Sequence, residues 1–511
     1  MLASGALYGL AFPPLRLEAL AWIAVAPLLI GLRGARTGET LFLMWVWTIA
    51  ASGASGHWLP RAVEVYYLQP AWVGWAFFLG IASVNGAPYY LPLGVVLQRL
   101  SSRFEGRSIE PLVIGAAWVT AELARGRLLN DLGVFISNPW AQLGYSQAGV
   151  PSLVQIASVT GIYGVTFAIV TCGATVAALF VRATQGGVRR GSWFPVVVAG
   201  LAPGLVLQAF GAAVLSSAPD EDAVVDGVTV AVVQAAIPWD VRWRPEFYGS
   251  NLDSYLELTS EALAQPIVPD VVVWPESAMA FFVEREPAYR RAIGEVLGRT
   301  GAELLAGGVR VAHSEGLPLY FNTFFALDDS GEIRGWVDKE KLVPFGEYFP
   351  LRTIAFLRRR FARVRTFEPG EPRAVLETRI GPAVVATCNE AMLPELVARR
   401  VGAGGEWIVN PSNDAWAPVP VFADQMLDMA RVRAIENRRW LVRASTTGPS
   451  AVVDPWGRVR ASAPLHRRGV ITGVVEARDG ITPYGRVGDL FAVGCAIAIG
   501  LLIAWRPSAR D

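Results

Sequence analysis

The chain has 511 residues, of which 53% are hydrophobic and only 17% are charged, with a formal net charge of +1. Soluble proteins carry about a quarter charged residues, and the deficit here falls on residues 1–216 and 490–505, which excludes a single large soluble enzyme. The balanced charge, with no basic stripe among aromatic residues, excludes a nucleic-acid-binding protein. The 3 histidines show no metal-ligand spacing and the 3 cysteines are too few for a disulfide framework, so we expect no metal and no cofactor.

Apolar stretches in the first 216 residues are candidate membrane spans, because a bilayer-crossing helix needs about 20 mostly apolar residues. The first stretch, residues 1–12, is short and lacks the basic start and small-residue cleavage site of a signal peptide. We interpret it as a first helix and leave open whether the N-terminus is complete. The other predicted spans lie near residues 18–33, 39–58, 70–98, 109–124, 150–181, 192–216 and 486–505. We therefore predict a multi-span α-helical membrane domain over residues 1–216 and a last transmembrane helix over residues 486–505.

Arginine residues gather in alternate connections between these spans, which predicts the orientation of the chain. Basic residues in short loops favour the cytoplasmic side of a membrane. The residues concerned are Arg33, Arg36, Arg99, Arg103, Arg107, Arg182, Arg189, Arg190, Arg506 and Arg510. Both termini are then cytoplasmic. The insert at residues 220–485 then lies outside the inner membrane, in the periplasm of a cell that has an outer membrane.

The apolar segment Leu132–Gln147 is too short for a span and is interrupted by Gly133, Pro139 and Gly144. Irregular backbone at membrane depth is tolerated only where protein or a cavity covers it. The segment therefore either dips into the membrane and returns beside the functional site, or forms a plain external loop. The sequence favours neither.

Residues 220–485 have an ordinary globular composition, with short β-branched runs alternating with amphipathic stretches. Some runs are apolar throughout, which is typical of strands covered on both faces. We predict strands at Val228–Val233, Val271–Trp274, Leu304–Gly308, Asn322–Leu327, Ala383–Thr387, Trp407–Asn410, Trp440–Ala444, Ala451–Asp454 and Val470–Glu476. We predict helices at Tyr248–Ala264, Pro287–Thr300 and Ala423–Asn437. The pattern indicates an α/β domain of layered sheets and helices with a core of its own.

Three segments carry reactive side chains. Glu276 follows one apolar run through Trp-Pro, Cys388 ends another, and Lys339 opens a loop that also carries Glu347. Strand ends are where α/β folds place ligands and catalysts. Each residue alone has an ordinary interpretation: a cap for the glutamate, a small buried hydrophobe for the cysteine, and a solvated charge for the lysine. Cys388 is nevertheless the only thiol outside the apolar stretches, so it is the candidate nucleophile.

Taken together, Glu276 in Trp-Pro-Glu-Ser, Lys339 ahead of Leu-Val-Pro-Phe-Gly-Glu, and Cys388 resemble the nitrilase, or carbon–nitrogen hydrolase, superfamily. More narrowly, the whole chain resembles the apolipoprotein N-acyltransferases, in which a multi-span membrane domain precedes an external nitrilase-like domain and one last helix. Shorter matches, in order, are Phe12-Pro13, Gly144–Gln147, Gly161–Gly164, Ser412–Trp416, Met429–Ala434 and Thr482–Tyr484. The resemblance implies a nitrilase-like αββα sandwich at residues 220–485.

The resemblance also implies an acyltransferase that works through a cysteine thioester. Cys388 would take an acyl chain from a phospholipid donor and pass it to the N-terminal amine of diacylglyceryl-cysteine on a diacylated lipoprotein. Glu276 would act as general base, since no histidine stands nearby in the sequence, and Lys339 would stabilise the oxyanion. Glu347 would orient Lys339 or position substrate, and Glu390 would fix the hydrogen bonds beside the nucleophile.

Other residues bear on the substrates. Trp243 matches an aromatic residue near the family's substrate entrance, and either contacts an acyl chain or packs at the surface. The run Phe356–Arg365 alternates basic with apolar residues, as in an interfacial lid that holds phospholipid head groups or a solvated loop. Asn389, Met426 and Thr446 stand where the family usually has Tyr, His and Asn. These departures leave the exact acyl donor and acceptor open.

Three alternatives remain at the level of sequence. The first is a paralogous membrane-bound acyltransferase or amidase, because water and an amine compete for the same thioester. The second is a pseudo-enzyme that serves as a scaffold, against which the intact Glu-Lys-Cys set argues. The third is a channel or transporter. The spans lack charged residues spaced as an ion path requires, although Glu122 stands near a helix end.

Overall fold

The computed structural model describes residues 1–128, 138–184, 193–220, 226–238, 244–350, 359, 366–373, 375–417 and 419–505. The chain divides into two compact units. Unit 1 comprises Met1–Glu64, Gln69–Ala218 and Val487–Asp511, and unit 2 comprises Val65–Leu68 and Pro219–Arg486. The chain therefore enters unit 2 twice, first for one short segment and later for the long insert.

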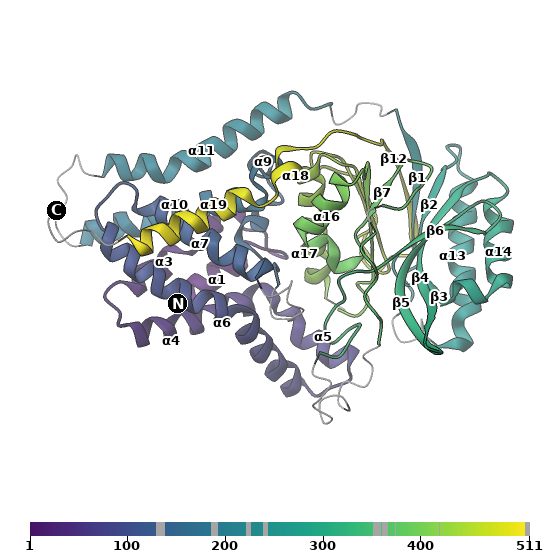
Figure 1. The fold of residues 1–511 in the computed structure, drawn as a ribbon, viewed down its shortest axis with the longest axis horizontal. Helices are drawn as coiled ribbons and strands as arrows, with labels where there is room; N and C mark the ends of the chain where they lie inside the picture. Colours follow the sequence, from purple (N-terminus) through teal and green to yellow (C-terminus); the bar gives the residue numbers. More distant parts are fainter. Residues whose placement is uncertain are drawn as a thin grey trace. The chain divides into compact units, whose positions relative to one another are not determined.

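Unit 1 is built from helices, which Figure 1 shows in purple and blue, with α11 in teal and α19 in yellow. Their bounds are α1 Leu2–Leu10, α2 Ala21–Ala24, α3 Ala26–Leu32, α4 Thr37–Gly56, α5 Trp58–Tyr66, α6 Ala71–Phe104, α7 Glu110–Arg127, η2 Leu143–Gln147, α8 Pro151–Val154, α9 Ala157–Thr160, α10 Ile162–Thr184, α11 Phe194–Ser216 and α19 Leu490–Ala504. The last residues of α5 already belong to unit 2.

Two stretches that the sequence predicts as continuous spans are broken. Residues 18–33 divide into α2 and α3, because Pro27 in the first turn of α3 cannot donate a backbone hydrogen bond to a preceding turn. Residues 150–181 begin with the short helices α8 and α9. Gly161, whose φ is +63°, ends α9 in a conformation that a helix cannot continue. The long helix α10 starts only after it.

Among the described helices, α10 and α11 are both long and apolar enough to cross a membrane. Helices α4 and α6 have 20 and 34 residues but do not reach the same apolar character. Helix α19 is apolar but has only 15 residues. Length and composition thus agree with the two predicted spans at 150–181 and 192–216, and the multi-span membrane domain stays a prediction.

Helix α1 packs against α4 through small residues. A Cβ atom added at Gly5 would lie 2.6 Å from the Cβ of Ala50, and one added at Gly9 would lie 2.1 Å from the Cβ of Ala54. Only glycine fits at that separation, and the backbones therefore approach closely. Gly5 and Gly9 form a G-x-x-x-G pattern, which is common where membrane helices pack. The short apolar piece at the N-terminus is thus an integral helix of unit 1.

Unit 2 contains two mixed β-sheets. In the described residues, the first sheet has the order β12-β1-β2-β4-β5-β6 with β3 beside β4, and the second has the order β11-β10-β9-β8-β7. The strands are β1 Val228–Gln234, β2 Val271–Val273, β3 Met279–Phe282, β4 Glu303–Ser314, β5 Leu317–Leu327, β6 Ile333–Asp338, β7 Ala383–Val385, β8 Trp407–Ser412, β9 Leu441–Ser445, β10 Ala451–Val453, β11 Val459–Ser462 and β12 Gly469–Val475. The helices are α13 Tyr248–Leu263, α14 Pro287–Leu297, α16 Pro394–Gly402, α17 Pro420–Asn437 and α18 Pro483–Val487.

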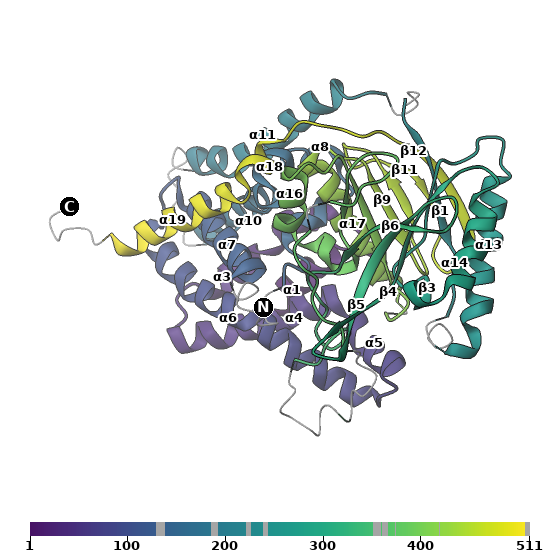
Figure 2. The ribbon, with the colours of Figure 1, turned by 45° about the vertical axis from the view of Figure 1, so that its right-hand side comes forward.

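Three buried clusters separate the four layers of unit 2. The first, with Tyr255 and Trp274, joins the first sheet to α13 and α14, which lie side by side in Figure 2. The second, with Val232 and Val409, fills the space between the sheets. The third, around Ile408, joins the second sheet to α16 and α17. This arrangement is the predicted αββα sandwich.

Every strand that the sequence predicts is present, with ends that differ by a few residues. The sequence analysis missed β3, β6, β11 and α16. Strands β6 and β11 are edge or near-edge strands whose residues are only partly buried, and β6 carries Arg334 and Gly335 in its middle. Mixed polar residues of this kind weaken the apolar pattern on which the prediction depended.

Candidate active site

Each of the three reactive residues follows the end of a strand. Strand β2 runs parallel to β1 and β4, and Glu276 follows its last residue through Trp274 and Pro275. Strand β7 runs parallel to β8, and Cys388 begins the short 3₁₀ helix Cys388–Met392 that follows it. Lys339 follows the last residue of β6. Three segments far apart in the sequence therefore deliver the predicted trio to unit 2.

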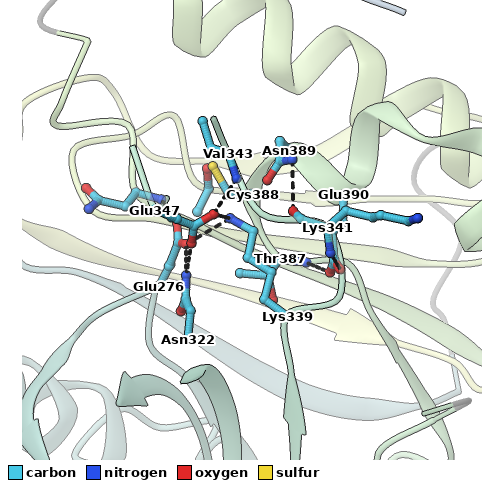
Figure 3. A network of polar contacts seen from close by, with 12 residues as sticks. Glu276, Asn322, Lys339, Lys341, Val343, Glu347, Thr387, Cys388, Asn389 and Glu390 are labelled. Carbon is cyan, nitrogen blue, oxygen red and sulfur yellow. Dashed lines mark hydrogen bonds and ion pairs between the residues drawn. The ribbon is translucent and has the colours of Figure 1, made fainter. Parts of the chain in front are cut away.

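Glu276, Lys339 and Glu347 form one buried ionic cluster (Figure 3). The Nζ atom of Lys339 lies 2.9 Å from Oε2 of Glu347 and 3.4 Å from Oε1 of Glu276. Asn322 lies between the carboxylates, and its Nδ2 donates to Oε1 of Glu276 at 2.6 Å and also to Oε1 of Glu347. The backbone N–H of Asn413 donates to Oε2 of Glu276 at 2.7 Å. These contacts satisfy both oxygens of the Glu276 carboxylate.

Cys388 lies beside this cluster, and only 5% of its surface is exposed. Its φ of +50° is unusual for a residue other than glycine, so its turn is conformationally strained. Burial, reinforced by the charge of Glu276 and opposed by that of Lys339, raises the pKa of the thiol to about 12. The resting sulfur is therefore protonated at neutral pH, and its reaction as a nucleophile requires a base.

Burial and neighbouring charges act differently on the pKa of Glu276 and on that of Lys339. Burial raises the pKa of Glu276 above its ordinary value, Lys339 opposes this effect, and Glu347 adds to it. Burial would lower the pKa of Lys339, but the charges of Glu276 and Glu347 outweigh burial and raise it. Lys339 is consequently a permanent cation, and Glu276 is a carboxylate that accepts a proton more readily than an exposed one.

Glu390 ties the turn of Cys388 to the loop of Lys339. Its Oε1 accepts the backbone N–H groups of Glu340 at 2.8 Å and Lys341 at 3.1 Å, and its Oε2 accepts that of Thr387 at 2.9 Å. Asn389 adds a second tie, since its Nδ2 donates to the carbonyl of Lys341 at 3.1 Å. The predicted supporting residues Glu347, Glu390 and Asn389 thus all lie next to the trio.

Other predicted residues have mixed outcomes. Trp243 lies outside the described residues, and so does the run 356–365 except for Arg359. Met426 is buried on α17. The hydroxyl of Thr446 donates to Oδ1 of Asn413 at 3.1 Å, so Thr446 is one residue removed from the carboxylate of Glu276.

The sequence analysis missed Asn322, Asn413 and Tyr67. Asn322 and the adjacent Thr323 are polar residues between apolar ones in β5, and this is the signal that could have identified Asn322. Tyr67 gives no such signal. It belongs to the short N-terminal segment of unit 2, and its hydroxyl donates to the carbonyl of Phe345 in the turn before Glu347. In the described part of the chain, no group of three or more His, Cys, Asp or Glu side chains is arranged to hold a metal ion.

A Glu-Lys-Cys trio at the strand ends of an αββα sandwich defines a nitrilase-like enzyme, and residues 229–480 match the carbon–nitrogen hydrolase family. Residues 4–175 match the apolipoprotein N-acyltransferase N-terminal domain. The chain is 33% identical to the apolipoprotein N-acyltransferase of Geobacter metallireducens, over 98% of this chain and 93% of that protein. It is 31% identical to that of Pseudomonas aeruginosa, over 100% and 95%. The chain belongs to the apolipoprotein N-acyltransferase family, which confirms the resemblance seen in its motifs.

Among solved structures, an amidase from Nesterenkonia sp. aligns at 20% sequence identity with a TM-score of 0.36. The alignment covers 51% of this chain and 95% of the amidase.

Proposed function

We propose that this protein transfers an acyl chain from a phospholipid to the N-terminal amine of a diacylated lipoprotein, through a thioester on Cys388. The observation that carries the proposal is the meeting of Glu276, Lys339 and Cys388 in one buried site of a chain that belongs to this family. A thiol, a carboxylate with a raised pKa and a fixed cation are the groups that acyl transfer through cysteine needs.

In the first half-reaction, Glu276 takes the thiol proton as the sulfur of Cys388 attacks the ester carbonyl of the phospholipid. A base is required because burial raises the pKa of the thiol to about 12. Lys339 stabilises the oxyanion of the tetrahedral intermediate, an effect worth about 3–4 kcal/mol in other acyl-transfer sites. The intermediate collapses, and the departing lysophospholipid alkoxide takes the proton from Glu276.

In the second half-reaction, the α-amine of diacylglyceryl-cysteine attacks the thioester carbonyl. Glu276 accepts a proton from the amine, and the intermediate expels the sulfur, which recovers a proton from Glu276. An amide and the free thiol result. Glu347 holds Lys339 in place at 2.9 Å through both steps, and Glu390 and Asn389 keep the turn of Cys388 attached to the Lys339 loop.

We further propose that unit 1, which includes α19, lies in the inner membrane as a multi-pass domain, with unit 2 on the periplasmic side. The apolar helices α10 and α11 support this assignment. Exposed apolar side chains on other helices support it too, because large apolar surfaces are rarely left in water. They include Phe42 and Trp45 on α4, Trp72 and Trp75 on α6, and Leu490, Ile497 and Leu501 on α19. The phospholipid donor and the lipid-anchored lipoprotein acceptor both lie in the membrane, so an enzyme that acts on them requires such a location.

The test is to incubate the purified full chain with phosphatidylethanolamine vesicles and to measure the mass of the peptide that contains Cys388. We expect an acyl adduct that a synthetic diacylated lipopeptide discharges as a triacylated product. The C388A variant should form no adduct, whereas the matched C172A variant should behave as the wild type. An adduct that water but not the lipopeptide discharges would favour an amidase or a paralogous acyltransferase, and no adduct at all would favour a scaffold.

A further inference from the structure

A buried polar residue of the neighbouring strand donates hydrogen bonds to the strained turn of Cys388. Asn410, on β8, is fully buried, and its Nδ2 donates to the backbone carbonyl of Ala386 and to that of Cys388 at 3.3 Å. Strand β7 pairs with β8 up to Val385 and Val409, so these two carbonyls lie just beyond the last residue of the paired ladder. Asn410 therefore supplies hydrogen bonds at the place where the sheet no longer does.

A second buried residue fixes the orientation of the Asn410 amide. Arg443, on β9, is the direct partner of Asn410 in the parallel β8–β9 pairing, and its Nη1 donates to Oδ1 of Asn410. Arginine can only donate hydrogen bonds, so the amide oxygen must face Arg443 and the amide nitrogen must face the two carbonyls. The orientation of the Asn410 side chain follows from this contact.

Arg443 is itself held on its other side. Its Nη2 lies 2.6 Å from Oδ2 of Asp414. The Asp414 carboxylate also accepts hydrogen bonds from two hydroxyls, that of Ser412 at 2.8 Å on Oδ1 and that of Ser445 at 2.6 Å on Oδ2. Arg443 and Ser445 are fully buried, and Asp414 is 2% exposed. Separating this buried ion pair would leave an uncompensated charge in the protein interior, so the guanidinium of Arg443 keeps its position.

We propose that Asn410 and Arg443 are positioning residues, which hold the strained turn of Cys388 so that its sulfur faces the Glu276–Lys339 cluster. The proposal rests on the proposed function of Cys388 as the nucleophile. Neither residue touches the reacting atoms. Asn410 acts through the carbonyl oxygens of Ala386 and Cys388, and Arg443 acts through the amide of Asn410. They complement Glu390, which accepts the backbone N–H of Thr387 in the same turn.

The test compares three variants of the full chain in detergent. N410A removes the amide without adding a charge, and N410D keeps its shape but offers no donor to the two carbonyls. T378A is the matched control, because it removes a hydroxyl that accepts from Nε1 of Trp407 at 3.3 Å, at the start of β8, and that makes no hydrogen bond to Asn410, Arg443 or the turn of Cys388 in the described part of the chain. Each variant is measured for kcat and KM of thioester formation with phosphatidylethanolamine, for the alkylation rate of Cys388 by iodoacetamide, and for the melting temperature.

We expect N410A and N410D to lower kcat at least tenfold with KM unchanged, and T378A to change kcat less than twofold. Wild-type kcat in either Asn410 variant would overturn the proposal. So would an equal loss in T378A, or a failure of both Asn410 variants to fold, since the contacts would then serve the fold alone. If the wild type forms no thioester, the proposed function fails. The alkylation rate of Cys388 by iodoacetamide then decides whether Asn410 positions the thiol: a rate altered in N410A and N410D supports this role, and a wild-type rate in both contradicts it.

Discussion

The two units each bury a carboxylate, and the surroundings of the two differ. Glu122 of α7 is fully buried in unit 1 and accepts hydrogen bonds from neutral donors: Nε1 of Trp118 at 3.2 Å, the N–H of Leu143 at 2.9 Å and the hydroxyl of Thr166 at 2.9 Å. Glu276 of unit 2 is 5% exposed and shares its site with a lysine, a second carboxylate and a thiol.

The difference separates a carboxylate that we propose is structural from one that we propose is reactive. The partners of Glu122 come from α7, η2 and α10, so the carboxylate joins three segments of unit 1, and among the described residues its hydrogen-bond donors are an indole, a backbone N–H and a hydroxyl. The partners of Glu276 include charged or ionisable groups, so the charges within the site change when one proton moves between them. Burial alone therefore does not mark a functional acid; the kind of partner does.

The largest effect that this comparison predicts is for E276Q. The amide cannot accept the thiol proton, so thioester formation should fall by roughly 10²–10⁴-fold. The melting temperature should change little, because the oxygen of the introduced amide could still accept from Asn322 or from the N–H of Asn413. Acyl-adduct mass spectrometry at short times measures the rate. A rate within tenfold of the wild type would show that another group takes the proton.

The next effect is for K339M, which removes the cation and keeps much of the side-chain length. Loss of oxyanion stabilisation should lower kcat by about 10²–10³-fold. The carboxylates of Glu276 and Glu347 would then face each other without a cation, so the acid limb of the pH–rate profile should also move to higher pH. Single-turnover kinetics over a pH series measure both changes. An unchanged kcat would remove Lys339 from the mechanism.

E347Q should shift the pH dependence in the opposite direction. The charge of Glu347 helps to raise the pKa of Glu276, and a protonated Glu276 cannot act as base, so activity falls as pH drops through that raised pKa. Removing the charge lowers the pKa of Glu276, and the acid limb should move to lower pH. Rates of thioester formation against pH, compared with the wild type, test this. A limb that moves upward contradicts it.

The smallest catalytic effect is expected for E122Q. One oxygen of the carboxylate is replaced by an amide nitrogen, which cannot accept the hydroxyl hydrogen of Thr166. We expect a loss of about 1–3 kcal/mol in stability, seen as a lower melting temperature, with kcat within about twofold of the wild type. A loss of kcat without a loss of stability would place Glu122 in the reaction and erase the contrast with Glu276.

Much of unit 2 was predictable because its central strands are apolar runs of β-branched residues, and its reactive residues stand at the ends of those runs. Val271–Val273 before Glu276 and Ala383–Val385 before Cys388 are examples. The family resemblance then supplied Lys339, whose strand β6 the apolar pattern alone did not reveal. The proposed trio could therefore be selected from the sequence without any knowledge of distances.

The supporting contacts were not predictable, because they depend on pairings between distant segments. Asn322 meets Glu276 through the β2–β4 and β4–β5 pairings and Glu347 through the β5–β6 pairing. Arg443 meets Asn410 because the two residues are partners in the β8–β9 register. In unit 1, the breaks at Val25 and Gly161 depend on single residues inside long apolar stretches. A hydropathy pattern averages over such residues, so it predicts a span and misses the interruption.

The short segment Val65–Leu68 has a topological consequence. It is part of unit 2, where the hydroxyl of Tyr67 donates to the carbonyl of Phe345, although it joins the unit 1 helices α5 and α6. A chain that crosses a bilayer cannot bring these residues to unit 2 unless the α5–α6 connection emerges on the same side. In the proposed membrane topology, the contact of Tyr67 therefore predicts the side of the α5–α6 connection, independently of the arginines in the other loops.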